Sequence, residues 1–467
     1  MNIKVTNFGP IQEAKITIKP ITVIIGKNNK GKSFLSQLIY SIISSFRGAR
    51  KKEYHPAFRS FGLEDIGEDF IVEQLYEEMN ITQQSRQFAA GKISRQQLIN
   101  QIFDSVRLLY SEWFKILLKE ELERTFGFNI GDLVRLGATR STITIRLSPS
   151  CYFLVTIGKS GSISATLKFN DDELLVDFIK NKNLIPSLES MRTKRPRTKQ
   201  LIIIIQAIRN VIRISPEFNY PYYLPAGRGG LIDSWDTISS AWTVLAAASI
   251  PRGINMPPLP GTSALFYNIT QSLQGTGSDE FIKLCENFRA LLNGDIVVNV
   301  DKTLGGKRDI RYIFKFLEHT KNINIIHAAS MIKELGPLYL FIREVLNKKD
   351  IFIVEEPESH LHPAAQRFFI MQIIVGLAEQ GVYSLFTTHS DIFIRTLAHS
   401  VYASSLQKNI KRLSIDKLSI CLFKEGTTGS ITKNVKIGTK GTLDSIPSFD
   451  EVIEELYDEE MCLSISE

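Results

Sequence analysis

Apolar and polar residues alternate over 3–5 and 14–18, on either side of a Gly9-Pro10 turn, which is typical of strands with one buried face. The run 21–25 is almost wholly β-branched and apolar, as expected of a strand buried on both faces. Residues 33–44 then change to helical spacing, which predicts a helix directly after that strand. The face it would bury consists of Phe34, Leu38 and Ile42.

The middle of the chain changes from helical to strand periodicity. Residues 63–126 predict helices, with apolar stripes typical of contacts in a core or with a partner helix. Residues 141–169 alternate with a period of two and predict a small antiparallel sheet. Residues 248–278 are rich in Pro, Gly, Ser and Asn and predict a long loop. The two helical stripes are Ile71, Leu75 and Met79, and Ile102, Val106, Leu109, Trp113 and Ile116.

Alternation of strands and helices returns in the last third of the chain. Strands are expected at 351–354, 383–387 and 418–423, with a helix over 363–379 between the first two. The acidic, amphipathic segment 450–460 predicts a closing helix. The whole pattern predicts an α/β protein.

Composition excludes several classes of protein. The chain has 467 residues, of which 43% are hydrophobic and 22% charged, so it can bury a large core without disulfides or metals. Its four cysteines form no CxxC pair, which argues against structural zinc and an oxidising compartment. No run approaches the roughly 20 apolar residues of a membrane span, and polar residues interrupt any signal peptide, so a cytoplasmic protein is expected. The net charge of +7 is compatible with a polyanionic partner.

The segment 26–33, GKNNKGKS, fits the phosphate-loop pattern GxxxxGK[ST]. It follows a buried type of strand and opens a helix, so backbone N–H groups and the helix N-terminus would converge on phosphate oxygens. Lys32 would reach the β and γ phosphates, and Ser33 would ligate Mg²⁺. A fortuitous Gly-Lys turn is the alternative. The expected nucleotide-binding residues are Gly26, Asn28, Asn29, Lys30, Gly31, Lys32, Ser33 and Phe34.

Two later strands end in residues suited to phosphate chemistry. The strand at 351–354 runs into Glu355 and Glu356, and the strand at 383–387 leads to His389. At such an edge one acid can hold Mg²⁺, usually through water, while its neighbour acts as general base toward the attacking water. The histidine could donate a hydrogen bond to the γ-phosphate. A charged turn and a capping histidine are the alternatives.

With these motifs, the chain resembles the ABC-type ATPase heads of the SMC and OLD class, and above all the "AAA family ATPases" found with nucleases in bacterial and archaeal anti-phage systems. The resemblance covers roughly residues 1–45 and 320–400. In the middle, 223–228 looks like a Pro-Ala-x-Arg element of these proteins. The other segments that carry the resemblance are Asn7–Ile11, 355–363 (EEPESHLHP) and 387–391 (TTHSD).

The resemblance implies a P-loop NTPase fold with a mixed sheet, an antiparallel β-subdomain and a helical insertion, binding ATP and Mg²⁺. It assigns Glu355 as the Walker B acid and metal ligand, Glu356 as the catalytic base, His389 as the switch histidine and 359–362 as the D-loop. Such heads enclose ATP in a homodimer, or a higher oligomer, where Ser330 would cap the partner's γ-phosphate. The domains expected are 1–62 (head with phosphate loop), 63–135 (helical insertion), 136–215 (small sheet, basic linker and helix) and 216–467 (remainder of the head).

Departures from the family pattern keep a second function open. Met331 stands where the family usually has Gly, which puts fast turnover in doubt and favours a hydrolysis-poor scaffold or sensor that binds ATP and holds an effector. The short segment after His389 has no second carboxylate cluster, so an effector nuclease would act in trans. The basic stretch 192–199 makes DNA a candidate partner, although a solvated linker explains it equally simply. A role in anti-phage defence or DNA maintenance is the expectation.

Overall fold

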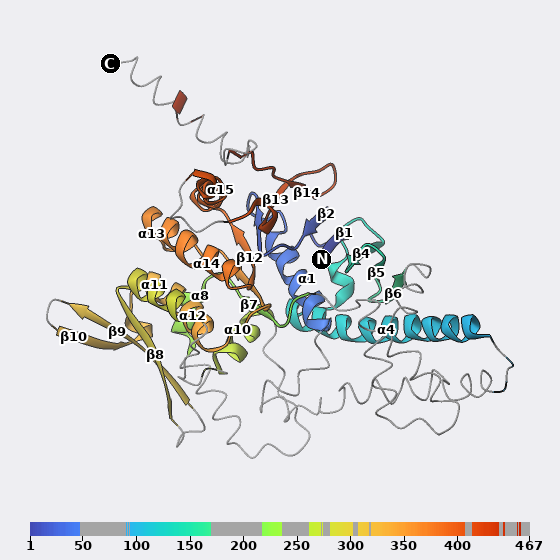
Figure 1. Cartoon of the computed structure of the whole chain (residues 1–467), viewed down its shortest axis with the longest axis horizontal. Coiled ribbons are helices and arrows are strands. Elements are labelled where there is room, and N and C mark those ends of the chain that lie inside the picture. The colour runs from blue at the N-terminus through green and yellow to red at the C-terminus, as the bar shows by residue number, and fades with distance from the viewer. Residues whose placement is uncertain are drawn as a thin grey trace. The chain divides into compact units, whose positions relative to one another are not determined.

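The computed structural model describes most of the chain as two compact units (Figure 1). The first unit comprises Met1–Lys15 and Ser41–Glu217, and the second Ile16–Tyr40 and Phe218–Glu467. Three features expected from the sequence lie wholly or mostly outside the described residues: the stripe at 71–79, the basic stretch 192–199 and the tail 450–460. The described ranges are 1–46, 94–169, 217–235, 261–271, 281–301, 307–316, 319–406 and 413–438, with isolated positions between and after them.

The first unit contains an antiparallel sheet whose neighbouring strands follow the order β6-β5-β4-β1-β2. Antiparallel pairing joins β1 to β4, β4 to β5, and β5 to β6. Alternate residues of β5 are buried, since Phe153, Val155 and Ile157 are fully inaccessible. The period-two sheet expected over 141–169 is confirmed. The strands are β1 (Asn2–Phe8), β2 (Ile11–Thr17), β4 (Arg140–Arg146), β5 (Cys151–Gly158) and β6 (Ile163–Phe169).

The long helix α4 (Arg95–Phe126) packs on this sheet, and its described buried residues do not follow the expected stripe at Ile116. Ile116, expected in the stripe, is 47% exposed, whereas Phe114 is fully buried. Its ring lies 4.5 Å from the rings of Phe46 and Phe153. Residues 113–118 are apolar almost all round the helix, so periodicity did not identify the face that the aromatic contacts bury.

The second unit contains a mixed sheet in which the order of neighbouring strands is β14-β13-β3-β12-β11-β7. All its neighbours are parallel except β14, which runs antiparallel to β13. The strands expected at 21–25, 351–354, 383–387 and 418–423 are confirmed; β7 and β14 were not expected. Their bounds are β3 (Ile21–Ile25), β7 (Pro221–Leu224), β11 (Ile351–Glu355), β12 (Tyr383–Thr388), β13 (Leu418–Glu425) and β14 (Ser430–Asn434).

Helices of the second unit follow its strands, and two of them differ from expectation. The helix α10 forms where a long loop was expected, because its apolar residues, with Phe266 fully buried, join the core. The helix expected over 363–379 is interrupted by a π-helical turn at Phe369–Ile374. Besides α4, the described α-helices are α1 (Lys32–Phe46), which begins in this unit, α8 (Arg228–Asp233), α10 (Gly261–Gln271), α11 (Ile282–Leu292), α12 (Ser330–Glu344), α13 (Pro363–Phe368), α14 (Val375–Glu379) and α15 (Asp391–Leu406).

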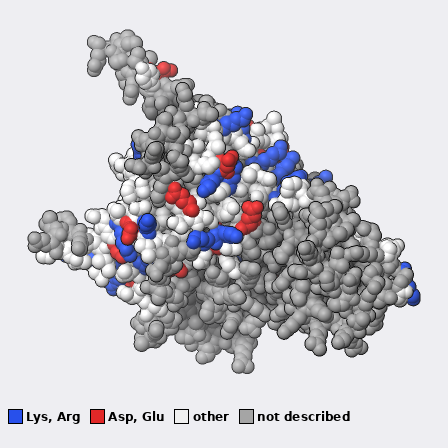
Figure 2. Space-filling view, viewed as in Figure 1, with Lys and Arg blue, Asp and Glu red and all other residues white. Residues whose placement is uncertain are grey.

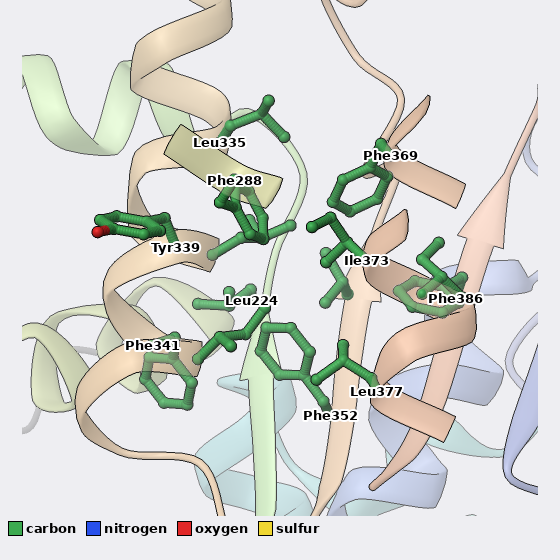
Figure 3. Close-up of a cluster of buried hydrophobic side chains, with 14 of the residues drawn as sticks. Leu224, Phe288, Leu335, Tyr339, Phe341, Phe352, Phe369, Ile373, Leu377 and Phe386 are labelled. Atoms are coloured by element: carbon green, nitrogen blue, oxygen red, sulfur yellow. The ribbon is translucent and has the colours of Figure 1, made fainter. Parts of the chain in front are cut away.

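A large hydrophobic core holds α12 and the α13–α14 segment against the parallel strands (Figure 3). From α12, Phe341 stacks on Phe352 of β11, with ring centroids 5.7 Å apart. Because both faces of these strands are buried, their carboxyl ends are held in fixed positions. The side chains labelled in the cluster are Leu224, Phe288, Leu335, Tyr339, Phe341, Phe352, Phe369, Ile373, Leu377 and Phe386.

A separate three-stranded antiparallel sheet, not expected from the sequence, precedes α12. Ile296, Ile310 and Tyr312 are buried in the core of the second unit. Its strands are β8 (Gly294–Asp301), β9 (Lys307–Phe316) and β10 (His319–Asn324).

Candidate functional site

The phosphate-loop segment 26–33 connects β3 to α1, as the sequence predicts. The loop needs glycine at its first position, because Gly26 has φ of 145° and a Cβ there would lie 2.8 Å from Cβ of Phe423. Gly31 also has a positive φ, of 100°, and its carbonyl accepts the first helical hydrogen bond from Leu35 N–H. The loop thus has the backbone turn that brings N–H groups to an anion at the start of a helix.

The remaining loop residues differ in accessibility. Asn28, Asn29 and Ser33 are exposed, and Phe34 is half-buried. Lys30 forms an ion pair with Glu425 at the end of β13, and this lysine lowers the pKa of the Glu425 carboxyl. Lys30 therefore already has a carboxylate partner on the neighbouring strand.

Lys32 is a buried cation at the base of the loop. Its side-chain Nζ donates to the carbonyls of Gly26 and Lys27, both at 2.9 Å, and the residue is 6% exposed. Loss of hydration lowers its pKa from 10.5 to about 8, although nearby carboxylates, first Glu356 and then Glu355, oppose that shift. The neighbouring acids do not fully compensate this ammonium for its burial. A bound polyphosphate would supply the missing negative charge.

The two acids at the end of β11, Glu355 and Glu356, have different surroundings. Glu355 is 6% exposed; its Oε1 accepts from Ser36 Oγ at 3.4 Å and its Oε2 from Ala226 N–H at 3.3 Å. Among the described residues, no lysine or arginine side chain lies within ion-pair distance of this carboxylate. A buried carboxylate without a cation partner fits a nearby divalent cation, which prefers oxygen ligands. Ser33, on the first turn of α1, offers a hydroxyl.

Glu356 is held in a strained backbone conformation. Its φ is 43°, a region that residues with a side chain seldom adopt. Its N–H donates to Thr387 O at 2.9 Å, which fixes it to the end of β12. The side chain is 39% exposed, and its Oε1 lies 3.6 Å from Nε2 of His389. Such strain persists where the surroundings hold the residue firmly, which occurs often at functional sites.

His389 follows β12 and faces both charged groups. Burial lowers its pKa below the usual value, the charge of Lys32 lowers it further, and Glu356 opposes the shift. The imidazole is therefore neutral near pH 7 and can donate one hydrogen bond. The structure thus brings Lys32, Glu356 and His389 together, because β3, β12 and β11 are adjacent and parallel.

Sequence reasoning missed the contribution of Glu358. Its Oε1 accepts from Thr388 Oγ1 at 2.5 Å and from His389 N–H at 3.0 Å, while its Oε2 is buried without a hydrogen-bond partner. Burial raises the pKa of this carboxyl. Glu358 therefore ties the segment after β11 to the histidine segment after β12. Glu358 could have been identified from the sequence as the third acid of the segment Glu-Glu-Pro-Glu.

Arg228, noted in the sequence only as part of the Pro-Ala-x-Arg element, is fully buried. Its guanidinium NH1 donates to the carbonyl of Glu355 at 2.6 Å, and NH2 donates to the carbonyl of Glu356 at 3.1 Å. It also pairs with Glu334 of α12. Arg228 thus supports the backbone that presents both acids.

Among the described contacts, Ser330 forms no hydrogen bond with the residues of this site. It is exposed at the first residue of α12. Its expected role toward a second copy of the chain therefore stays a prediction.

The described residues show no metal cluster, and the face drawn in Figure 2 carries charges of both signs. Within them, no three His, Cys, Asp or Glu side chains group as metal ligands. On the face shown in Figure 2, basic and acidic side chains are interspersed. None of the helices formed by these residues has the length and apolarity needed to cross a membrane.

Comparison with known families supports the expected resemblance. Residues 1–123 match the family described as "AAA ATPase domain", and residues 317–395 match "AAA domain, putative AbiEii toxin, Type IV TA system". Two separate segments of the chain are thus similar to AAA ATPase domains. The first match includes the phosphate loop, and the second includes Glu355, Glu356 and His389. None of the curated proteins compared with the chain is significantly similar to it.

Solved structures similar to the chain include SMC head domains. The head bound to the C-winged helix domain of ScpA is 12% identical, with 93% of this chain and 98% of that chain covered and a TM-score of 0.42. The head from Thermotoga maritima is 10% identical over 93% and 98%, with a TM-score of 0.38. The head from Pyrococcus furiosus with an extended coiled coil, bound to the C-terminal domain of ScpA, is 12% identical over 98% of both chains, with a TM-score of 0.41. These values describe a distant likeness.

The chain has a mixed α/β fold of the P-loop NTPase kind, as expected.

Proposed function

We propose that this chain binds ATP with Mg²⁺ at residues 26–33, hydrolyses it, and couples its nucleotide state to assembly. The observation that carries the proposal is the meeting of Lys32, Glu356 and His389 at the carboxyl edge of three neighbouring strands. In sequence, Lys32 precedes Glu356 by 324 residues and His389 by 357 residues, so only folding brings them together. A cation can hold the phosphates, a carboxylate can activate the attacking water, and a neutral imidazole can donate a hydrogen bond to a phosphate oxygen.

Binding would rest on the loop and on Lys32. The backbone N–H groups after Gly26 and the N-terminus of α1 would receive phosphate oxygens, and the buried ammonium would receive the β and γ phosphates. Ser33 and Glu355 would hold Mg²⁺, which supplies charge neutralisation at the phosphates. Asn28, Asn29, Lys30, Gly31 and Phe34 complete the proposed nucleotide-binding segment.

Hydrolysis would use Glu356 as the general base. Its carboxylate would accept a proton from the water whose oxygen attacks the γ-phosphorus, while the bond to the ADP oxygen breaks. The neutral His389, 3.6 Å from that carboxylate, would donate a hydrogen bond to the γ-phosphate. Glu358 and Arg228 would keep the two segments that carry these side chains in place.

Assembly would join two copies around two nucleotides. Ser330 is exposed at the start of α12, where its hydroxyl and the first N–H groups of the helix are available to a phosphate held by a second copy. We therefore propose an ATP-dependent homodimer, with a higher oligomer built from it as the extension.

The test compares Lys32→Ala with Glu356→Gln. We expect Lys32→Ala to abolish ATP binding, because it removes the cation at the phosphates. Glu356→Gln should keep ATP affinity, reduce turnover by about 100-fold or more, and accumulate an ATP-bound dimer. Nucleotide binding by calorimetry, phosphate release and sedimentation measure the three quantities. Equal ATP affinity of Lys32→Ala and the wild type would refute the site.

Met331 favours a second function, that of an ATP-binding scaffold with negligible hydrolysis that holds an effector protein. Its side chain stands beside Ser330 and packs partly against the core, where a glycine would leave the backbone open to a phosphate. A phosphate-release rate that is the same in the wild type and in Glu356→Gln would support the scaffold over the hydrolase.

The biological partners are proposed from the resemblance. We propose an effector nuclease acting in trans, DNA contacted through the stretch 192–199, and a role in anti-phage defence or DNA maintenance. A nuclease gene next to the gene for this chain would support the effector, and purification of the two proteins as a complex would test it.

A further inference from the structure

We propose that Arg228 is a positioning residue that couples Glu355 and Glu356, at the end of β11, to the first turns of α12. The inference rests on the proposed ATPase function and deepens it, since it explains how nucleotide state at Glu356 reaches the segment that begins with Ser330. It depends on a continuous set of contacts within the second unit, from Glu356 through Arg228 to Glu334.

The first half of the connection is a set of bonds from one guanidinium to main-chain carbonyls. NH1 donates to Glu355 O at 2.6 Å and to Pro225 O at 2.7 Å, and NH2 donates to Glu356 O at 3.1 Å. Arginine suits this site because its planar donors diverge at fixed angles and stay charged. The bonds fix the carbonyls on either side of the point where the chain turns into the strained Glu356, and so fix the direction of its carboxylate.

The second half of the connection reaches α12. Nε of Arg228 donates to Glu334 O at 3.1 Å, and NH2 lies 3.1 Å from Oε2 of the same residue. The Glu334 side chain is only 3% exposed, and its Oε1 accepts from Gly229 N–H at 2.9 Å. Glu334 stands one helical turn after Ser330, so a displacement at its backbone moves the start of α12 as well.

The ion pair between Arg228 and Glu334 is buried, so its main effect is to hold the two segments in position. Arg228 is fully buried and Glu334 is 2% exposed, so neither side chain can rotate into water when the other moves. If one of these partners moved away, the buried guanidinium would be left with an unpaired charge, which is costly. The structure avoids this cost if the segment on the other side of Arg228 moves as well. A small shift of the Glu356 carbonyl on ATP binding or hydrolysis is therefore passed to α12 as a displacement of a packed helix.

The test uses Glu334→Gln, which keeps the shape of the side chain and an acceptor for Gly229 but removes the charge that faces Arg228. We expect the KM for ATP to stay within about twofold, while kcat falls about fivefold or more, the range of a coupling between sites. ATP-dependent dimerisation, measured in the Glu356→Gln background by sedimentation, should weaken by a similar factor. A purely structural role would lower the melting temperature without this split between KM and kcat.

The matched control is Asp233→Asn. Asp233 forms an ion pair with Lys333 that joins the same two helices, α8 and α12, but it is half exposed and does not contact Arg228. We expect this variant to keep wild-type kcat and dimerisation. If Glu334→Gln matches the wild type within twofold in both quantities, or raises KM alone, the inference is wrong.

Two further measurements keep the outcome decisive. If Glu334→Gln does not fold, Arg228→Lys takes its place. A single ammonium cannot donate to all four carbonyls, so this variant should also lower kcat while leaving KM nearly unchanged. If neither folds, amide exchange of the wild-type monomer decides: ATP with Mg²⁺ should slow exchange at residues 330–336, and unchanged exchange would overturn the inference. Failure of the proposed function is distinct, because it would appear as ATP binding that Lys32→Ala does not affect.

Discussion

The burial of Lys32 predicts that ATP affinity depends on pH in a specific way. Its pKa of about 8 lies 2.5 units below the ordinary value of 10.5. At 1.36 kcal/mol per pKa unit, keeping this ammonium charged at its buried position costs about 3 kcal/mol relative to water. The unfolded chain binds the proton more tightly between pH 8 and 10.5, so the free energy of unfolding should rise with pH over that interval. A bound triphosphate should restore the pKa and recover much of this cost.

The expected change in affinity follows from the fraction of Lys32 that is protonated. If only the charged form binds the phosphates, the Kd for ATP is nearly constant up to pH 7 and becomes about tenfold larger at pH 9. Binding should also take up about half a proton at pH 8, and about 0.9 at pH 9. His389 contributes little over this range, because its lowered pKa lies below it.

Calorimetry measures both quantities, since titrations in buffers of different ionisation enthalpy report the number of protons taken up. The control is Lys32→Arg, which stays charged throughout this range and should show neither the pH dependence nor the proton uptake. A wild-type Kd that is constant within twofold from pH 7 to 9, together with no proton uptake, would refute the assignment of Lys32 to the phosphates.

Other predictions test the loop, the start of α12 and the DNA contact. Gly26→Ala should lower the free energy of unfolding by about 2–5 kcal/mol in denaturant titrations, because its Cβ would meet Phe423 at 2.8 Å and φ is 145°. An unchanged midpoint would contradict this reasoning. Met331→Gly should strengthen ATP-dependent dimerisation, measured by sedimentation. The same change should lower the free energy of unfolding by about 1 kcal/mol, because glycine has a lower helix propensity than methionine. Weaker dimerisation would argue against Ser330 as the capping residue. Neutralising Arg195 and Arg197 should flatten the salt dependence of DNA affinity, whereas affinity insensitive to salt in the wild type would exclude a phosphate contact.

Much of the site could be predicted because its parts are local. The order of strand, phosphate loop and helix around Lys32 follows from periodicity and one motif, and the structure confirms those elements. Glu355, Glu356 and His389 were singled out because they stand at or just after the ends of apolar strands. Parallel pairing of β3, β12 and β11 then brings these strand ends to one edge.

Other parts of the site could not be predicted, because they depend on contacts distant in sequence. Arg228 is bonded to Glu356, 128 positions away, and Glu358 accepts from the main chain of His389, 31 positions away. The sequence marked Arg228 only as part of the Pro-Ala-x-Arg element and Glu358 only as part of the segment 355–363, and no local pattern indicates that such charged residues are buried.

What the sequence by itself determined is therefore the set of local elements and the motif residues they carry. Only the tertiary structure decided which face of α4 is buried, that 261–271 folds as a helix, and that a buried arginine joins the strand end to α12. The physical reason is that periodicity and turn chemistry act over a few residues, whereas burial and long-range hydrogen bonds depend on which segments meet.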